Sequence, residues 1–504
     1  MLVKHVPGRK HRPSSRRFST RSKMVTPKGV WRTYADFLCL VLLASYLIFI
    51  PGGLPGFGIV AIALVLKLST VPRLETVGIY MLLFGMKTFG LVSIVFGHPG
   101  IGGKIAFIIG VTVLVFTTSF GKTLFNLRLP FIYFLWFFTV IYWAYLDGPQ
   151  TLYCDNKLSK SIIFGILFLV AFYYLLNSRV VDWLQLGQLG VLSALVILTV
   201  SIIAMPHLKP NSMLDIGAIR TQFDLKDLFE FRNLLGGVAV LSFALLLAAT
   251  PDRFLTRLSL LNLLIYSSAA FIILAWGGSR LPLATAIAIV VSMLLVKPLY
   301  RKRYTIVTIG IGAVIFGLLL YGLSQHLQFI SSAFDSSQSY SQRFNRTINW
   351  EAGLRRFFEK PIWGHGIGGY YIKGFSFPGE GTYAHNLVLE LLVETGIVRT
   401  LLILLPLFFL YNPLGSYFYA RRANNGGAVF PLLLVLFLQS MISFDLSANI
   451  GFFSMVGAIA ASSKKKRKKS VKDRQKQFDW RKKRLLPLAS FTPPSTNPNH
   501  KTHL

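Results

Sequence analysis

The stretch GQLGVLSALVILTVSIIAM, residues 187–205, decides the fold class because none of its side chains is ionisable. A helix of about 20 such residues crosses the hydrocarbon core of a bilayer. Backbone polar groups in lipid must be satisfied within the segment, and a helix does this. Similar apolar runs recur along the chain, so the sequence predicts several membrane-spanning helices.

The composition agrees with this prediction. Apolar residues make up 53% of the 504 residues and charged residues 14%, and the mean hydropathy is +0.56. A soluble chain of this size cannot hide so much apolar surface behind so few charges. We therefore predict an all-α polytopic membrane protein with about 14 transmembrane helices, in the range of about 12–14. The predicted span cores are 35–50, 57–71, 76–97, 103–119, 129–146, 160–177, 187–205, 234–250, 257–276, 281–297, 304–323, 397–412, 428–444 and 446–462.

The net charge of +34 lies mainly in the two ends of the chain. Residues 1–33 contain ten Lys or Arg and no acid, and residues 464–504 contain fourteen Lys or Arg against Asp473 and Asp479. Basic runs beside spans mark the cytoplasmic side and can touch anionic membrane lipids. We expect both tails, 1–34 and 463–504, to be disordered and cytoplasmic. We expect no nucleic-acid binding, because the tails contain no fold known for it.

An even number of spans keeps both tails on one side and divides the rest of the chain. Residues 35–323 would hold the first eleven spans with an outer loop at 206–233, residues 324–396 a large outer loop, and residues 397–462 the last spans. Cys39 lies in the first apolar run and Cys154 in a loop, so we expect no disulfide between them.

Cations on the predicted outer face need an explanation, because Lys and Arg usually avoid translocated loops. Arg280 lies between two spans with almost no loop around it, and its guanidinium can clamp a phosphate. The alternative is an arginine that reaches out to a lipid phosphate. The same two interpretations apply to Arg220. Arg355 and Arg356 fit one face of an amphipathic surface helix, expected over 349–359.

His385 directly precedes Asn386, where the polar loop is predicted to become a helix. A neutral imidazole can take a proton from a sugar hydroxyl near neutral pH, although a lone His can also be a hydrogen-bonded interface residue. Glu390 and Glu394 share one face of that helix and either orient substrate or pair with nearby arginines. His365 is a weaker candidate because glycines flank it.

Residues 364–369, GHGIGG, match the pattern G-x-G-x-x-G. No strand precedes them, so a dinucleotide site is rejected. We expect these glycines to let the backbone turn sharply between the helix at 349–359 and the loop that leads to His385. No two histidines on this face have the spacing of metal ligands, so no metal site is predicted.

An ordered set of motifs runs through this region. The motifs are Ser279-Arg280, RFNR at 343–346, WEAGL at 350–354, FEKPIWGHGIG at 358–368, AHNLVLE at 384–390 and Glu394-Thr395-Gly396. In this order they resemble the O-antigen ligase/polymerase superfamily over about residues 215–400. The chain departs from the family pattern in two places: Leu281-Pro282 follow Ser279-Arg280 where the family has Gly-Ala, and Arg399 stands where a second glycine is usual.

The resemblance implies a metal-independent glycosyltransferase of the GT-C type in the bacterial inner membrane, with no cofactor. Such enzymes take a glycan from an undecaprenyl-diphosphate carrier on the periplasmic face. They pass it to the lipid A core, to a growing glycan or to protein. In that scheme His385 activates the acceptor hydroxyl, and Arg280 and Arg220 hold the diphosphate. Further residues expected to orient substrates are Arg343, Arg346, Glu390 and Asn386.

The motifs are shared by ligases and polymerases and do not separate them. The alternative from another class is an anion, inorganic-carbon or polysaccharide transporter. A transporter is expected to have charges near span centres in two related halves, whereas these candidates gather on one predicted face and no inverted repeat is visible. A scaffold protein with basic tails would not explain the ordered motifs.

Overall fold

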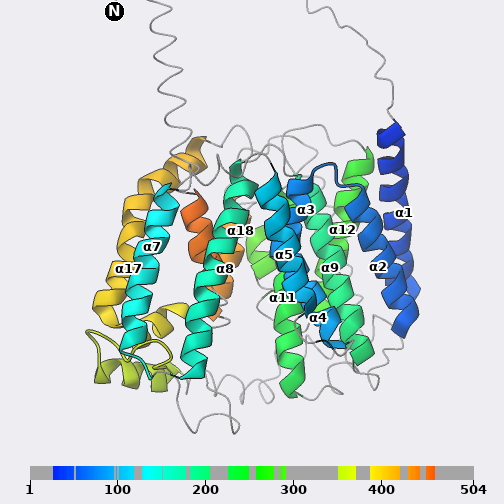
Figure 1. The fold of residues 1–504 in the computed structure, drawn as a ribbon. Helices are drawn as coiled ribbons and strands as arrows, with labels where there is room; N and C mark the ends of the chain where they lie inside the picture. Colours follow the sequence, from blue (N-terminus) through cyan, green and yellow to red (C-terminus); the bar gives the residue numbers. More distant parts are fainter. Residues whose placement is uncertain are drawn as a thin grey trace, which may run out of the picture.

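A computed structural model describes residues 27–49, 53–95, 98, 101–117, 128–149, 151–177, 182–204, 225–248, 257–276, 282, 285–290, 350–370, 386–420, 429–442 and 450–459. Throughout these ranges the chain forms helices and turns, without any strand. The long helices run side by side in one bundle (Figure 1). The predicted all-α fold is therefore confirmed for this part of the chain.

The helices follow the order of the predicted spans. Their bounds are α1 Pro27–Phe49, α2 Gly53–Ser69, α3 Leu74–Tyr80, the π-helical turn η1 Met81–Gly85, α4 Met86–Val95, α5 Ile101–Phe116, α7 Arg128–Leu146, α8 Leu152–Asn177, α9 Trp183–Ala204, α11 Leu225–Ala248, α12 Arg257–Trp276, α17 Leu387–Ala420 and α18 Val429–Ile442. Residues 350–359 and 450–459 are also helical.

Several helices begin earlier than hydropathy indicates. α1 begins at Pro27, α8 at Leu152 and α11 at Leu225. A hydropathy window detects the apolar centre of a helix. The backbone hydrogen bonds of the helix continue beyond that centre, through polar residues at its ends. The predicted span at 304–323, most of 281–297, residues 1–26 and the tail 463–504 lie outside the described residues. Residues 27–34, which the sequence predicted to be part of a disordered tail, instead form the start of α1.

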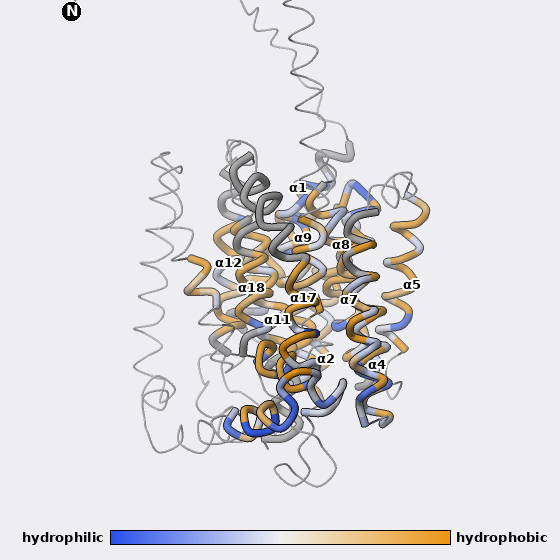
Figure 2. Tube along the Cα trace, turned by 90° about the vertical axis from the view of Figure 1, so that its left-hand side faces the viewer, coloured by the Kyte–Doolittle hydropathy of each residue, from blue (hydrophilic) through white to orange (hydrophobic). Residues whose placement is uncertain are grey.

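Three of the described helices are long and apolar enough to cross a membrane: Leu74–Ser93, Leu152–Leu176 and Trp183–Ser201. The first runs through η1 without interruption, as expected for a π-turn inserted into an α-helix. Hydrophobic residues predominate along the helices in Figure 2. Shorter apolar helices lie at Leu54–Ser69, Ile101–Phe116, Leu135–Leu146, Leu234–Leu247, Asn262–Leu274 and Ile450–Ile459. The total of about 14 spans stays a prediction.

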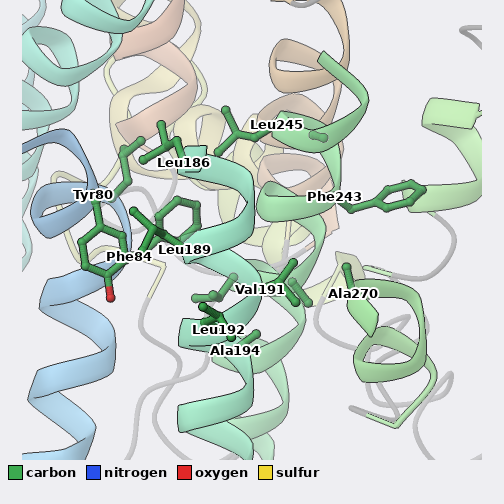
Figure 3. Close-up of a cluster of buried hydrophobic side chains, with 14 of the residues drawn as sticks. Tyr80, Phe84, Leu186, Leu189, Val191, Leu192, Ala194, Phe243, Leu245 and Ala270 are labelled. Atoms are coloured by element: carbon green, nitrogen blue, oxygen red, sulfur yellow. The ribbon is translucent and has the colours of Figure 1, made fainter. Parts of the chain in front are cut away.

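The larger core is built around α9, which packs against α2, α4, α11 and α12. A helix that is apolar all round belongs in an interior. Figure 3 shows Leu189 of α9 close to the rings of Tyr80 and Phe84. The hydroxyl of Tyr80 is paired with that of Ser193 at 2.8 Å, so its burial leaves no polar atom unsatisfied.

A smaller core joins α7, α17 and the helix at 450–459. Phe137 and Ile141 of α7 pack with Ile403 of α17 and Phe453. The same cluster includes Ile367, which belongs to the segment 350–370. This apolar contact attaches that segment to the bundle.

Candidate functional site

The segment 350–370 lies near the lower ends of α7, α8 and α17 (Figure 1, yellow-green). Residues 350–359 form a helix, within one residue of the predicted start, and turns follow over 361–370. Ala144 near the end of α7 accepts a hydrogen bond from the N–H of Ile367 at 3.1 Å. The segment is therefore held against the bundle by backbone bonds as well as by apolar packing.

The turns depend on glycine. Gly364, Gly366 and Gly368 have φ angles of 74°, 84° and 80°, a region that other residues rarely adopt. A Cβ at Gly366 would lie 2.3 Å from the Cα of Gly148, and one at Gly368 would lie 2.4 Å from the Sγ of Cys154. The glycines thus serve the sharp backbone turns that the sequence predicted, and in addition they permit close packing against Gly148 and Cys154.

These turns fit into a break in α17. Gly396 has a φ of 67° and a ψ of 177°, which interrupts the helix. A break frees backbone groups that must find other partners. Hydrogen bonds of 2.8–2.9 Å supply them, running from the N–H groups of His365, Gly366 and Ile397 to the carbonyls of Val393, Glu394 and Pro361 respectively. The segment 350–370 and the broken helix α17 therefore satisfy one another's backbone hydrogen-bonding groups.

A buried ion cluster holds α8 to the first turns of α17. The Nζ of Lys157 donates to Glu390 and lies 2.7 and 2.9 Å from the two carboxylate oxygens of Glu394. All three side chains are at most 2% exposed. The N–H of Gly368 also donates to Glu394, at 3.0 Å. Buried charges need such compensation, because desolvation is costly.

The structure shows which charged group pairs with the two glutamates. Glu390 and Glu394 do pair with a cation, but it is Lys157 and not an arginine. Lys157 was missed because the predicted span began at 160, which left it in a loop. The signal in the sequence was a lysine close to an apolar run, on the same predicted face as the two carboxylates.

Asn386 caps the start of α17. Its Oδ1 accepts hydrogen bonds from the N–H groups of Val388 at 3.0 Å and Leu389 at 3.2 Å. This is the geometry of an N-cap residue. The side-chain oxygen of Asn386 is thus used within the protein, and residue 385 directly precedes a capped helix.

Arg399 lies almost fully buried just after the break in α17. Its guanidinium carbon is 4.4 Å from the ring centre of Trp143 and 5.5 Å from that of Trp363. It donates to the carbonyl of Trp363 at 2.7 Å and to the carboxylate of Asp147. Stacking and directed hydrogen bonds of this kind suit arginine and not lysine. Arg399 joins α17, α7 and the segment 350–370.

His365 has a structural setting. Its Nε2 contacts the backbone carbonyl of Arg356 at 2.6 Å. Partial burial, together with the neighbouring cations Arg356 and Lys360, lowers the pKa of His365, although the Arg356 carbonyl and Glu359 oppose this. Arg356 in turn donates to the carbonyl of Gly369 at 2.6 Å. These contacts close the turns onto the helix at 350–359.

Five of the predicted site residues lie outside the described residues: His385, Arg280, Arg220, Arg343 and Arg346. Asn386 and Glu390 lie inside, and both belong to the start of α17. The structure brings Glu390 together with Glu394 and Lys157. The roles predicted for all seven residues stay predictions.

The described part of the chain is a helical membrane protein with a buried charged cluster where α8 and α17 meet the segment 350–370. Residues 265–404 match the family model described as O-antigen ligase. This match agrees with the resemblance that the motifs indicate: residues 265–404 are similar to the O-antigen ligase family. No curated protein matches the chain.

Proposed function

We propose that this protein transfers a glycan from an undecaprenyl-diphosphate carrier to an acceptor hydroxyl on the periplasmic face of the bacterial inner membrane. Both termini are cytoplasmic in this proposal. The family match supports it, because residues 265–404 contain Arg280, the RFNR motif at 343–346 and His385. The acceptor is the lipid A core for a ligase or a carrier-linked glycan for a polymerase.

In the proposed reaction the acceptor oxygen attacks the anomeric carbon of the donor sugar. The bond from that carbon to the diphosphate oxygen breaks, and its electron pair leaves with the undecaprenyl diphosphate. His385 accepts the proton of the acceptor hydroxyl as general base. Arg280 and Arg220 bind the charge on the diphosphate, a task that cations perform without a metal ion.

The observation that carries the proposal is the capped and ion-paired start of α17. Asn386 caps the helix directly after His385, and Glu390 in the following turn is fixed by Lys157. A catalytic group needs a supporting structure that holds it in place. A histidine next to this anchored helix start therefore suits a general base that must meet a bound sugar.

Transfer in isolated membranes tests the proposal. His385→Ala and Arg280→Ala should each abolish glycan transfer from a diphosphate carrier while the amount of protein is unchanged. Arg355→Ala is the matched control, because Arg355 is exposed and pairs with Glu351 on the surface. Transfer retained by both site variants would refute the assignment. Uptake of a solute by a chain that makes no glycan product would favour the transporter.

The glycans of a deletion strain separate the two proposed enzymes. Long glycans that never reach the acceptor would indicate a ligase. Single repeat units on the acceptor would indicate a polymerase.

A further inference from the structure

The helix at 350–359 has three different faces. Gly353 and Phe357 face the protein, where Phe357 packs with Tyr370 and Leu389. Glu351 and Arg355 are exposed and form an ion pair at 2.6 Å. Between these two faces lies a third, which is exposed but apolar.

The third face continues past the end of the helix into the turns. At about 3.6 residues per turn, side chains four apart share a face, which groups Trp350, Leu354 and Phe358. The exposed fractions along this face are 41% for Trp350, 47% for Leu354, 70% for Phe358, 56% for Ile362 and 47% for Trp363. Five large apolar side chains in one exposed row are unusual for a surface in contact with water.

The row continues onto exposed apolar side chains of α7. The rings of Trp363 and Trp143 of α7 lie 5.2 Å apart, and Trp143 is exposed as well. Trp136 of α7 is exposed and donates to the carbonyl of Leu402 in α17 at 2.9 Å. The apolar row of 350–363 is therefore continuous with the exposed apolar surface of α7.

We infer that the segment 350–363 is a membrane-interface anchor, with Leu354 and Phe358 inserted among lipid acyl chains and Glu351 and Arg355 facing water. The occupant of the apolar row is thus the lipid bilayer. Two observations favour lipid over a protein partner: the row is continuous with α7, and its two tryptophans prefer the boundary between headgroups and acyl chains. A helix with an apolar stripe beside a charged one is typical of an interfacial helix. The inference does not depend on glycan transfer.

Spin labelling of the full chain in proteoliposomes of phosphatidylethanolamine and phosphatidylglycerol tests this anchor. Nitroxides are attached at Leu354→Cys and Phe358→Cys, and at Glu351→Cys and Arg355→Cys as matched controls on the charged face. The native thiols Cys39 and Cys154 are buried, and unsubstituted protein gives the background label. Collisions with oxygen report lipid, and collisions with a water-soluble nickel chelate report water.

We expect a ratio of oxygen to nickel collisions several-fold higher at positions 354 and 358 than at 351 and 355. Equal ratios at all four positions would place the apolar face in water and overturn the anchor. Exclusion of both reagents at 354 and 358 would mean that another protein or a second copy covers the face, which also overturns it.

Discussion

Lys157 is the most consequential single residue of the buried cluster, and Lys157→Met tests its role. The substitution removes the cation that contacts both Glu390 and Glu394 and leaves two carboxylates with side chains at most 2% exposed. Removing one partner of a buried ion pair typically costs about 3–5 kcal/mol. Because Lys157 serves two carboxylates, we expect the free energy of unfolding to fall by at least about 3 kcal/mol.

The assay is equilibrium unfolding of the purified chain in mixed micelles. Lys160→Met is the matched control, because Lys160 lies one turn away on α8 and is exposed; it should change stability by less than about 0.5 kcal/mol. Adding Glu390→Gln and Glu394→Gln to Lys157→Met should restore much of the loss, since carboxamides carry no charge to compensate. If Lys157→Met is no worse than Lys160→Met, the cluster does not hold α8 to α17.

Three further changes probe the contacts around the break in α17. Gly366→Ala should lower the free energy of unfolding by at least about 1–2 kcal/mol from its positive φ alone, and the contact of the new Cβ with Gly148 should add to this loss. The control is Gly58→Ala on α2, whose Cβ would meet nothing within 4 Å and which should be neutral or stabilising. Equal effects of the two substitutions on unfolding would refute the packing argument. Arg399→Lys should lower the free energy of unfolding by about 1.5–3 kcal/mol, the typical contribution of hydrogen bonds to charged groups, and an unchanged value would contradict the role given to the guanidinium. The pKa of folded His365 is below its ordinary value of 6.5, so the unfolded chain binds more protons and stability should fall as pH falls below about 6.5. The thermal midpoint of His365→Gln should change less on acidification than that of the parent chain, and identical pH profiles would exclude His365 as a source of the loss.

The sequence predicted the features that depend on local pattern. Apolar runs located the helices, and the pattern around Arg355 and Arg356 predicted a helix at 349–359, where the structure has one at 350–359. Glycine was expected at the sharp turns, where Gly364 and Gly366 do have positive φ angles. Each of these properties depends on neighbouring residues or on the preference of a side chain for water or lipid. It can therefore be predicted from one amino-acid sequence.

The local sequence pattern does not show which buried charges pair with one another. Lys157 and Glu390 are 233 positions apart, and hydropathy reports burial in lipid without reporting which charges meet. In the sequence Arg399 is visible only as a departure from the family pattern. In the structure its side chain contacts Trp143, Trp363 and Asp147. Such contacts depend on how helices distant in sequence pack together.

The central claim is that this chain transfers a glycan from a diphosphate carrier, and transfer by the purified protein tests it most directly. The purified chain is supplied with an undecaprenyl-diphosphate-linked glycan and a hydroxyl acceptor in the presence of a metal chelator. We predict that glycan-bearing acceptor and undecaprenyl diphosphate appear in equal amounts, and that His385→Ala forms neither. Product formation by His385→Ala at the parent rate, or no product from the parent chain with either the lipid A core or a carrier-linked glycan as acceptor, would contradict the account.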